Sequence, residues 1–206
     1  MKYEWKKQEK DLYGVKQNPA LITVPIQNYI MISGKGSPNN EDFSNRVAAL
    51  YSLAYAVKMG YKLAAAKGGI FSDISDFAVY PLEGVWRKQK QRDGLVKEEL
   101  EYTIMIRQPD FITENMVCTA LENVKKKKPN PWYEEIRFDT MADGKCIEML
   151  HIGTFDDEPA SFEKMARFAK QNGLKRGESC HREIYLNNPT RVEQSKLKTI
   201  LRFSVT

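Results

Sequence analysis

The chain has 206 residues, of which 42% are hydrophobic and 29% charged, and a formal net charge of +5. These are the proportions of an ordinary globular protein rather than of a disordered or membrane protein. No apolar run approaches the roughly 20 residues of a membrane span, and the first residues, MKYEWKKQEKDLYG, contain no apolar segment of signal-peptide type. We therefore expect a cytoplasmic protein without membrane contact.

Metal and nucleic-acid binding are not indicated. The three cysteines, Cys118, Cys146 and Cys180, lack C-x-x-C spacing, which argues against a disulfide framework and against a zinc site. The dense basic cluster from Lys125 to Lys128 follows a helix predicted over residues 110–124, where lysines favour the negative helix end. With its other basic residues dispersed and no recognition helix evident, the chain predicts no nucleic-acid partner.

The first half of the chain predicts extended segments, a long helix and two strands. LITVPIQNYIMISGKGSPN reads as extended chain with Pro25 between its segments. From Glu41 to Lys67, apolar residues recur at helical spacing, and Gly68 follows as a stop. DFAVYPLEGVW and KEELEYTIMIRQP predict strands, the first interrupted by Pro81 and Gly84.

The second half repeats this order. PWYEEIRFDTM and GKCIEMLHIG predict a hairpin, PASFEKMARFAKQNG a helix, and CHREIYL and KTILRFSV two more strands. We predict one domain over residues 1–206, made of two pseudo-repeats at about 20–108 and 131–206, with an inserted helix and linker at 109–130. Two helices on one face of an antiparallel sheet give an α+β fold, whose other face must be covered or functional.

That other face is the predicted binding site. In the strand CHREIYL, side chains alternate, so His181, Glu183 and Tyr185 share one face, opposite Ile184. A carboxylate held among aromatic rings gains a raised pKa and serves as an acid, a base or a counter-ion. We expect the face to collect Glu83, Trp86, Met105, Glu183 and Tyr185, with Trp132, Tyr133, His151 and Phe155 at its rim.

Several of these residues also have an ordinary structural interpretation. Trp132 after Pro131 is equally suited to anchoring a loop, and Glu83 to capping a turn. His151 is more typical of a hydrogen-bonded core histidine than of a base, because no partner for it is evident. Asp156 and Asp157 are typical of charges at a helix N-terminus.

Five motifs, in order along nearly the whole chain, resemble the freestanding GyrI-like small-molecule-binding proteins: ISGKGSPNNEDF, YPLEGVW, IRQPDFIT, LHIGTFDDEPASFEKM and REIYLNNPTRVEQSKLKTILRFSV. The resemblance implies a duplicated β-α-β-β module that forms a concave antiparallel sheet, with two main helices on one face and a ligand cleft on the other. It also implies that Glu183, in the EIY motif, is the counter-ion for lipophilic cations.

One subfamily of these proteins, the cyclopropanoid cyclopropyl hydrolases, opens the strained ring of DNA-alkylating compounds. This resemblance implies a hydrolase without metal or cofactor, with Glu183 first and Glu83 second as the catalytic carboxylate and Tyr185 as hydrogen-bonding partner. The alternatives are a non-catalytic multidrug-binding or sequestering protein and a gyrase-interacting inhibitor. Gyrase contact would favour an acidic surface, whereas this chain is slightly basic. Whether the protein is a homodimer is left open.

Overall fold

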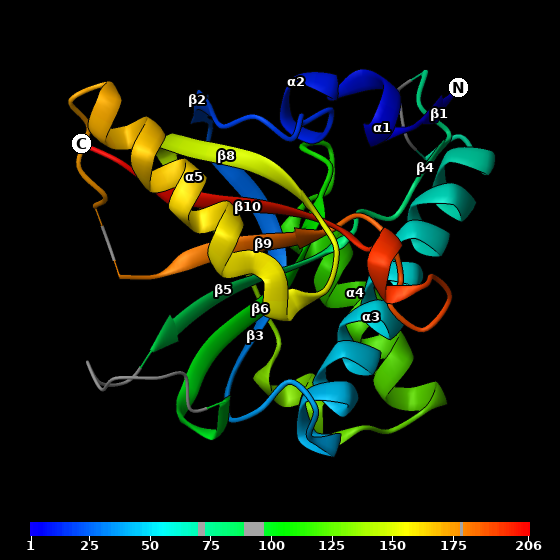
Figure 1. Ribbon diagram of the computed structural model, residues 1–206. Coiled ribbons are helices and arrows are strands. Elements are labelled where there is room, and N and C mark those ends of the chain that lie inside the picture. Colours follow the sequence, from blue (N-terminus) through cyan, green and yellow to red (C-terminus); the bar gives the residue numbers. More distant parts are fainter. Residues whose placement is uncertain (70–72, 89–96, 178) are drawn as a thin grey trace.

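The computed structural model describes residues 1–69, 73–88, 97–177 and 179–206. These residues contain ten strands and five α-helices (Figure 1). The helices are α1 (Trp5–Gln8), α2 (Lys10–Tyr13), α3 (Glu41–Ala66), α4 (Glu114–Lys127) and α5 (Glu158–Gln171). The strands are β1 (Lys2–Tyr3), β2 (Ala20–Val24), β3 (Gln27–Lys35), β4 (Asp76–Phe77), β5 (Leu82–Lys88), β6 (Leu100–Gln108), β7 (Arg137–Met141), β8 (Gly144–Ile152), β9 (His181–Tyr185) and β10 (Lys198–Ser204).

The predicted α+β class and the repeated element order are both present. An eight-stranded sheet has the order β2-β8-β10-β9-β5-β6-β3-β7, and every neighbouring pair in it is antiparallel. One module is β3-α3-β5-β6 and the other is β8-α5-β9-β10, and they meet where β5 pairs with β9. The inserted helix α4 begins at Glu114 rather than at residue 110, because Thr113 accepts the Met116 N–H as its N-cap.

The predicted hairpin of residues 131–153 is wrong. β7 pairs with β3 of the first module, while β8 pairs with β2 and β10. Each module therefore supplies an edge strand to the other. The links from β2 to β3 and from β7 to β8 are two residues long, Pro25-Ile26 and Ala142-Asp143. Such a link spans roughly 10 Å, whereas β2 and β3 in a flat sheet would lie roughly 29 Å apart. The sheet must therefore curl until its two ends meet.

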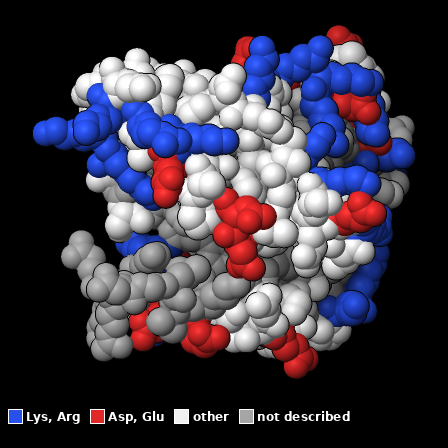
Figure 2. Space-filling model, in the orientation of Figure 1, with Lys and Arg blue, Asp and Glu red and all other residues white. Residues whose placement is uncertain are grey.

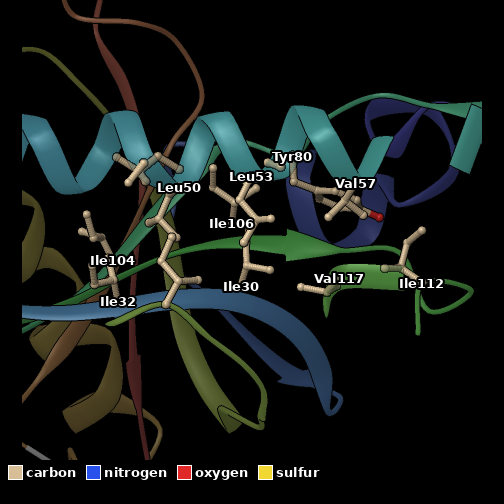
Figure 3. Packing of buried hydrophobic residues seen from close by; sticks show 14 of the residues in the cluster. Ile30, Ile32, Leu50, Leu53, Val57, Tyr80, Ile104, Ile106, Ile112 and Val117 are labelled. Atoms are coloured by element: carbon tan, nitrogen blue, oxygen red, sulfur yellow. The ribbon is translucent and has the colours of Figure 1, made fainter. Parts of the chain in front are cut away.

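Both main helices cover the same face of the sheet. Directly paired residues point to the same side, and the pairs form one row across six strands: Ile32, Ile104, Gly84, Glu183, Leu201 and Met149. Ile32 and Ile104 pack with Leu50, Leu53 and Val57 of α3 (Figure 3). At the other end of the row, Leu201 and Met149 pack with Met165 of α5. Each such side chain, fully buried, stabilises the fold by roughly 1.5–3 kcal/mol.

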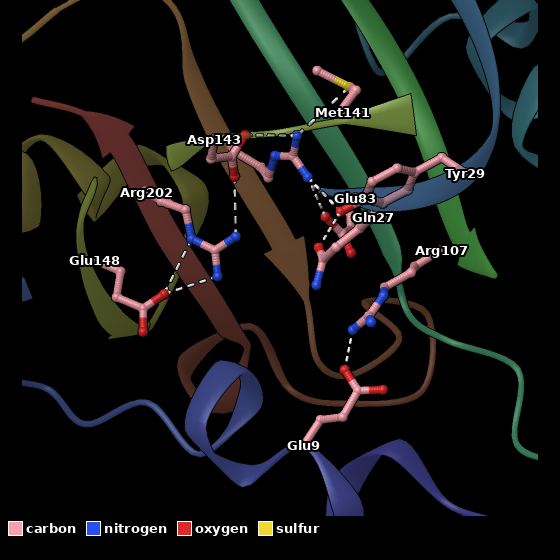
Figure 4. A network of polar contacts seen from close by, with 10 residues as sticks. Glu9, Gln27, Tyr29, Glu83, Arg107, Met141, Asp143, Glu148 and Arg202 are labelled. Carbon is pink, nitrogen blue, oxygen red and sulfur yellow. Dashed lines mark hydrogen bonds and ion pairs between the residues drawn. The ribbon is translucent and has the colours of Figure 1, made fainter. Parts of the chain in front are cut away.

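The opposite face carries a buried network of ion pairs (Figure 4). Arg182 contacts Glu83 at 3.0 Å and Asp143 at 2.8 Å, and Arg202 contacts Asp143 at 3.1 Å and Glu148 at 2.9 Å. Asp143 lies in the β7–β8 link, so this link passes over the face opposite the helices and the sheet curls toward that side.

The N-terminal segment covers the same face. Glu9, between α1 and α2, forms an ion pair with the buried Arg107 of β6 and accepts a hydrogen bond from Tyr80. Trp5 of α1 stacks on the Tyr80 ring, with centroids 5.8 Å apart. The face that was expected to hold the ligand cleft is thus filled by ion pairs and covered by the chain itself.

We predict that Asp143→Ala destabilises the protein by about 3 kcal/mol, because two buried arginines lose a shared partner. Urea unfolding measures this change. Asp139→Ala is the matched control, since its carboxylate lies at 3.9 Å from Arg137 in a surface ion pair with both side chains more than half exposed, and it should cost less than about 0.5 kcal/mol. Equal effects of the two substitutions would contradict this view of the network.

Candidate functional site

Glu183 lies at the centre of the helix-covered face, between the packing areas of α3 and α5. It is directly opposite Gly84 in the β5–β9 pairing, and Leu201 flanks it on β10. Glu183 is only 9% exposed. The strand alternation that begins at His181 brings His181 and Tyr185 to the same side, so three polar side chains of β9 converge above the sheet.

Hydrogen bonds fix both oxygens of the Glu183 carboxyl group. His181 Nε2 lies 2.8 Å from Oε1, and the Tyr185 hydroxyl donates to Oε2 at 2.8 Å. The Trp86 indole N–H on β5 donates to the Tyr185 oxygen at 2.9 Å. Burial, followed by the charge of Glu183, holds the pKa of the Tyr185 hydroxyl well above its usual range, so Tyr185 stays a donor.

A second carboxyl group lies against the first. Glu158 is the first residue of α5 and is 7% exposed. Burial, together with the neighbouring charges of Glu183 and then Asp156, raises the pKa of Glu158 to about 9. Two adjacent buried carboxyl groups disfavour double ionisation, so Glu158 keeps its proton at neutral pH and can share it with Glu183 in a hydrogen bond. We call Glu158, Glu183, His181, Tyr185 and Trp86 the Glu183 cluster.

Aromatic rings surround this cluster. Phe155 meets the Tyr185 ring edge-on with centroids 5.9 Å apart, and Phe162 of α5 meets His181 in the same way at 4.8 Å. Phe43, in the first turn of α3, stacks on Trp86 at 5.8 Å. Phe155 is 42% exposed, so the aromatic surface reaches solvent.

The surface above the cluster is acidic. In Figure 2, a group of acidic side chains lies in the middle of the molecule, surrounded mainly by uncharged residues, where α5 begins in Figure 1. Asp156 and Asp157, in the 3-10 helix Phe155–Asp157 just before α5, are exposed, and Asp157 accepts a hydrogen bond from Thr154 at 2.7 Å. Negative charge at this position stabilises the N-terminus of α5 and attracts cations to the site.

The cluster combines a proton donor, a proton acceptor and aromatic faces. The ionised carboxylate can accept a proton from water or balance a positive charge, while its protonated neighbour can return a proton. Aromatic faces favour flat or cationic molecules. Among the residues that the structure describes, no group of three or more His, Cys, Asp or Glu side chains is placed to bind a metal ion.

The structure divides the residues that were expected to form one wall. Glu183, Tyr185, Trp86 and Phe155 lie together, as described above. Glu83 and Met105 do not join them, because they belong to the next row of paired residues, which points to the opposite face. The expectation that all of these side chains share an uncovered face is therefore wrong. Glu83 is 1% exposed and bound to Arg182, and burial raises its pKa while the arginine opposes that rise.

The remaining rim candidates lie elsewhere or are already engaged. Trp132 covers the Arg46 guanidinium at 4.1 Å, and Tyr133 is buried beside it in the 3-10 helix Pro131–Glu135, which packs on α3. Arg46 bonds the Ser33 carbonyl near the end of β3, three strands away from β9 in the sheet order. His151 lies on the same face as Glu183, but its nitrogens are 2.9 Å from the Ser161 hydroxyl and from the Thr154 carbonyl oxygen.

Sequence reasoning missed Glu158 and the roles of Phe162 and Phe43. Glu158 follows Asp156 and Asp157, and all three resemble ordinary acidic residues at a helix start. A sign was available: the helix period places Glu158 on the side of Ser161, Met165 and Ala169, the residues that α5 buries. An acid on the buried side of an amphipathic helix calls for a specific partner.

Comparison with known proteins assigns the chain to a family. A model of the GyrI-like small molecule binding domain matches residues 17–205. The chain belongs to the GyrI-like family. A sequence comparison with curated proteins finds no match. This family is described as binding small molecules. The Glu183 cluster combines polar and aromatic side chains, which are suited to that task.

Crystal structures of three Listeria innocua proteins are similar over almost the entire chain. One, described as an uncharacterized conserved protein, is 35% identical with a TM-score of 0.90, covering 99% of this chain and 100% of its own. Two described as hydrolases are 33% and 34% identical with TM-scores of 0.85 and 0.87, covering 99% and 100% of this chain and all of their own. The C-terminal domain of EcmrR is 12% identical, with a TM-score of 0.55 over 92% of this chain and 97% of its own, and shares the fold.

A groove of about 420 Å³ lies elsewhere, between α3 and α4. Its walls include Met59, Gly60 and Leu63 of α3 and Thr119 and Asn123 of α4, and no carboxylate is among its described lining residues. Lys127 is its charged lining residue and has no carboxylate beside it in the groove as described, so the Glu183 cluster is the better candidate for chemistry. Of the helices in the described ranges, none combines the length and apolar character needed to cross a bilayer.

We predict that Gly84→Ala disturbs the site and costs about 1–3 kcal/mol of stability. A Cβ atom at this position would lie 2.6 Å from the Trp86 Nε1 atom and 3.4 Å from the Tyr185 hydroxyl, so the indole must move. Urea unfolding and near-ultraviolet circular dichroism measure the two effects. Gly60→Ala is the control: it lies inside α3 with open space around its Cβ position, and should gain about 0.5–1 kcal/mol. An unchanged near-ultraviolet spectrum in Gly84→Ala would contradict the prediction.

Proposed function

We propose that the Glu183 cluster binds flat aromatic or cationic xenobiotics, and that the protein detoxifies cyclopropanoid compounds by adding water to their activated cyclopropane ring. The observation that carries the proposal is a carboxylate and a protonated carboxyl group held together among aromatic rings. Membership of a small-molecule-binding family and the similarity to two proteins described as hydrolases support it.

In the proposed reaction, Glu183 accepts a proton from a water molecule as the water oxygen bonds to a ring carbon. The ring carbon–carbon bond breaks, and its electrons move through the conjugated dienone to the carbonyl oxygen. That oxygen takes up a proton from solvent, so the net change is the addition of one water. The proton on Glu183 returns to solvent, and neither a metal nor a cofactor enters the balance.

The neighbouring residues have distinct proposed roles. His181 and Tyr185 hold the carboxylate in place through their hydrogen bonds. The rings of Trp86, Tyr185 and Phe155 stabilise the positive charge that develops at the ring carbon as its bond breaks. Glu83, which was the second candidate for the carboxylate, takes no part in this proposal because it lies on the opposite face in an ion pair.

A second candidate function is binding without turnover, as in a sequestering protein. The burial of Glu183 favours this alternative, because a fixed counter-ion in an aromatic site holds a cation without any reaction. The two candidates share one site and differ only in whether water is activated there.

Incubation with a duocarmycin-type cyclopropanoid, followed by mass spectrometry, separates these functions. We expect product with the mass of the substrate plus one water, and a rate about 100- to 10,000-fold lower in Glu183→Gln, because the proton acceptor is lost. Glu163→Gln, at an exposed position of the same α5 helix, should keep the full rate. Tight binding of unchanged substrate would establish the sequestering alternative, and full turnover by Glu183→Gln would remove this carboxylate from the mechanism.

We also predict that Trp86→Ala weakens the binding of a flat aromatic dye about thirtyfold, which corresponds to a loss of about 2 kcal/mol for a buried aromatic anchor. Fluorescence titration measures the affinity. Trp132→Ala serves as the comparison, since this ring stacks on Arg46 instead of facing the cluster. A larger loss from Trp132→Ala than from Trp86→Ala would place the ligand elsewhere.

A further inference from the structure

The two carboxyl groups of the cluster differ in how completely they are bonded. Glu183 uses both oxygens, one toward His181 and one toward Tyr185. Glu158 Oε1 is buried and receives no hydrogen bond from a donor among the described residues, so its neighbour Glu183 can satisfy Glu158 only through a proton between the two carboxyl groups. When that proton leaves, a buried oxygen without a donor is costly, and the cost falls when a ligand supplies a positive charge or a donor.

Acidic, aromatic and hydrogen-bonding groups surround this pair on the neighbouring elements. Glu158 is influenced by Glu183 on β9 and by Asp156 in the 3-10 helix Phe155–Asp157. On β9, His181 and Tyr185 face Glu183. From β5, Trp86 contributes an uncharged N–H, and from α3, Phe43 contributes a ring. A second negative charge in the pair is therefore balanced either by a proton on His181, which lies 2.8 Å from Glu183, or by a cation from outside.

We propose that a flat aromatic cation enters this site in exchange for the proton shared by Glu158 and Glu183, so that binding of the cation releases one proton to solvent. The inference rests on the proposed binding function of the cluster. Before binding, the two carboxyl groups carry one negative charge and one proton. After binding, they carry two negative charges beside one positive ligand. The site keeps the same net charge, and the proton passes to the buffer.

The exchange gives the affinity a defined pH dependence. The proton must leave when the cation binds, so affinity rises with pH by up to about tenfold per pH unit while the free pair is protonated. The rise stops near pH 9, where free Glu158 loses its proton unaided. A neutral aromatic ligand displaces no proton, so its affinity has no such slope.

Ethidium and its uncharged parent phenanthridine are suitable probes. Calorimetric titration at pH 7.5 in phosphate and in Tris, which differ in heat of ionisation, gives the number of protons released per ligand. We expect close to one for ethidium and close to zero for phenanthridine. In Glu158→Gln, which keeps the side-chain shape, ethidium should still bind but release almost no proton and show an affinity independent of pH between 6.5 and 8.5. Glu163→Gln should behave as the unchanged protein.

The outcomes separate the exchange from the binding function on which it rests. Ethidium binding to the unchanged protein without proton release would overturn the exchange and leave the binding site intact. Proton release that persists in Glu158→Gln would assign the proton to His181 and would also overturn it. Failure of both probes to bind would remove the proposed function together with this inference.

Discussion

The pairing of β5 with β9 is the constraint on which the rest of the structure depends. It joins the two modules into one sheet, and its register places Glu183 opposite Gly84 and Arg182 opposite Val85. A shift by one residue would exchange the two faces of the strand. Glu183 and Tyr185 would then face the ion pairs, and Arg182 would lie under the helices among aromatic rings. The register is held from both sides, by the Trp86–Tyr185–Glu183 hydrogen bonds on one face and the Arg182–Glu83 pair on the other.

The two faces handle buried charge in opposite ways. On the face away from the helices, each buried carboxylate contacts an arginine, so the charges are balanced within the fold. On the helix face, Glu158 and Glu183 lie beside each other and the charged groups acting on Glu158 are acidic. A structural network needs its partners built in, whereas a binding site keeps part of its charge unbalanced for the ligand. This contrast, more than the shape of the surface, is the reason for proposing that the helix face is the functional one.

Local sequence patterns made most of the helices and strands predictable. They did not predict which distant strands pair with each other. The helical spacing of residues 41–67 and the alternation in β6 and β9 gave the elements and the grouping of Glu183 with Tyr185. Alternation shows which residues share a face of one strand, but it contains no information on which face the helices cover. That is why Glu83 was placed beside Glu183. β7 was paired with β8 for a similar reason: adjacent strands usually form hairpins, and the exchange of edge strands leaves no local sign. Glu158 was missed because its partner is on a different element.

The exchanged edge strands also determine how the chain reaches this structure. β2 pairs with β8, so that Ala20 lies opposite Glu148, and β7 returns to β3, which precedes it by more than a hundred residues. Contacts between such distant segments form slowly, because a long loop must close before any of them contributes. During synthesis the first module cannot complete its sheet until β7 has been made, whereas the second module uses β2, which was made near the start of the chain. We therefore expect the two modules to fold as one cooperative unit, so that the proposed ligand site at their boundary forms only together with that unit.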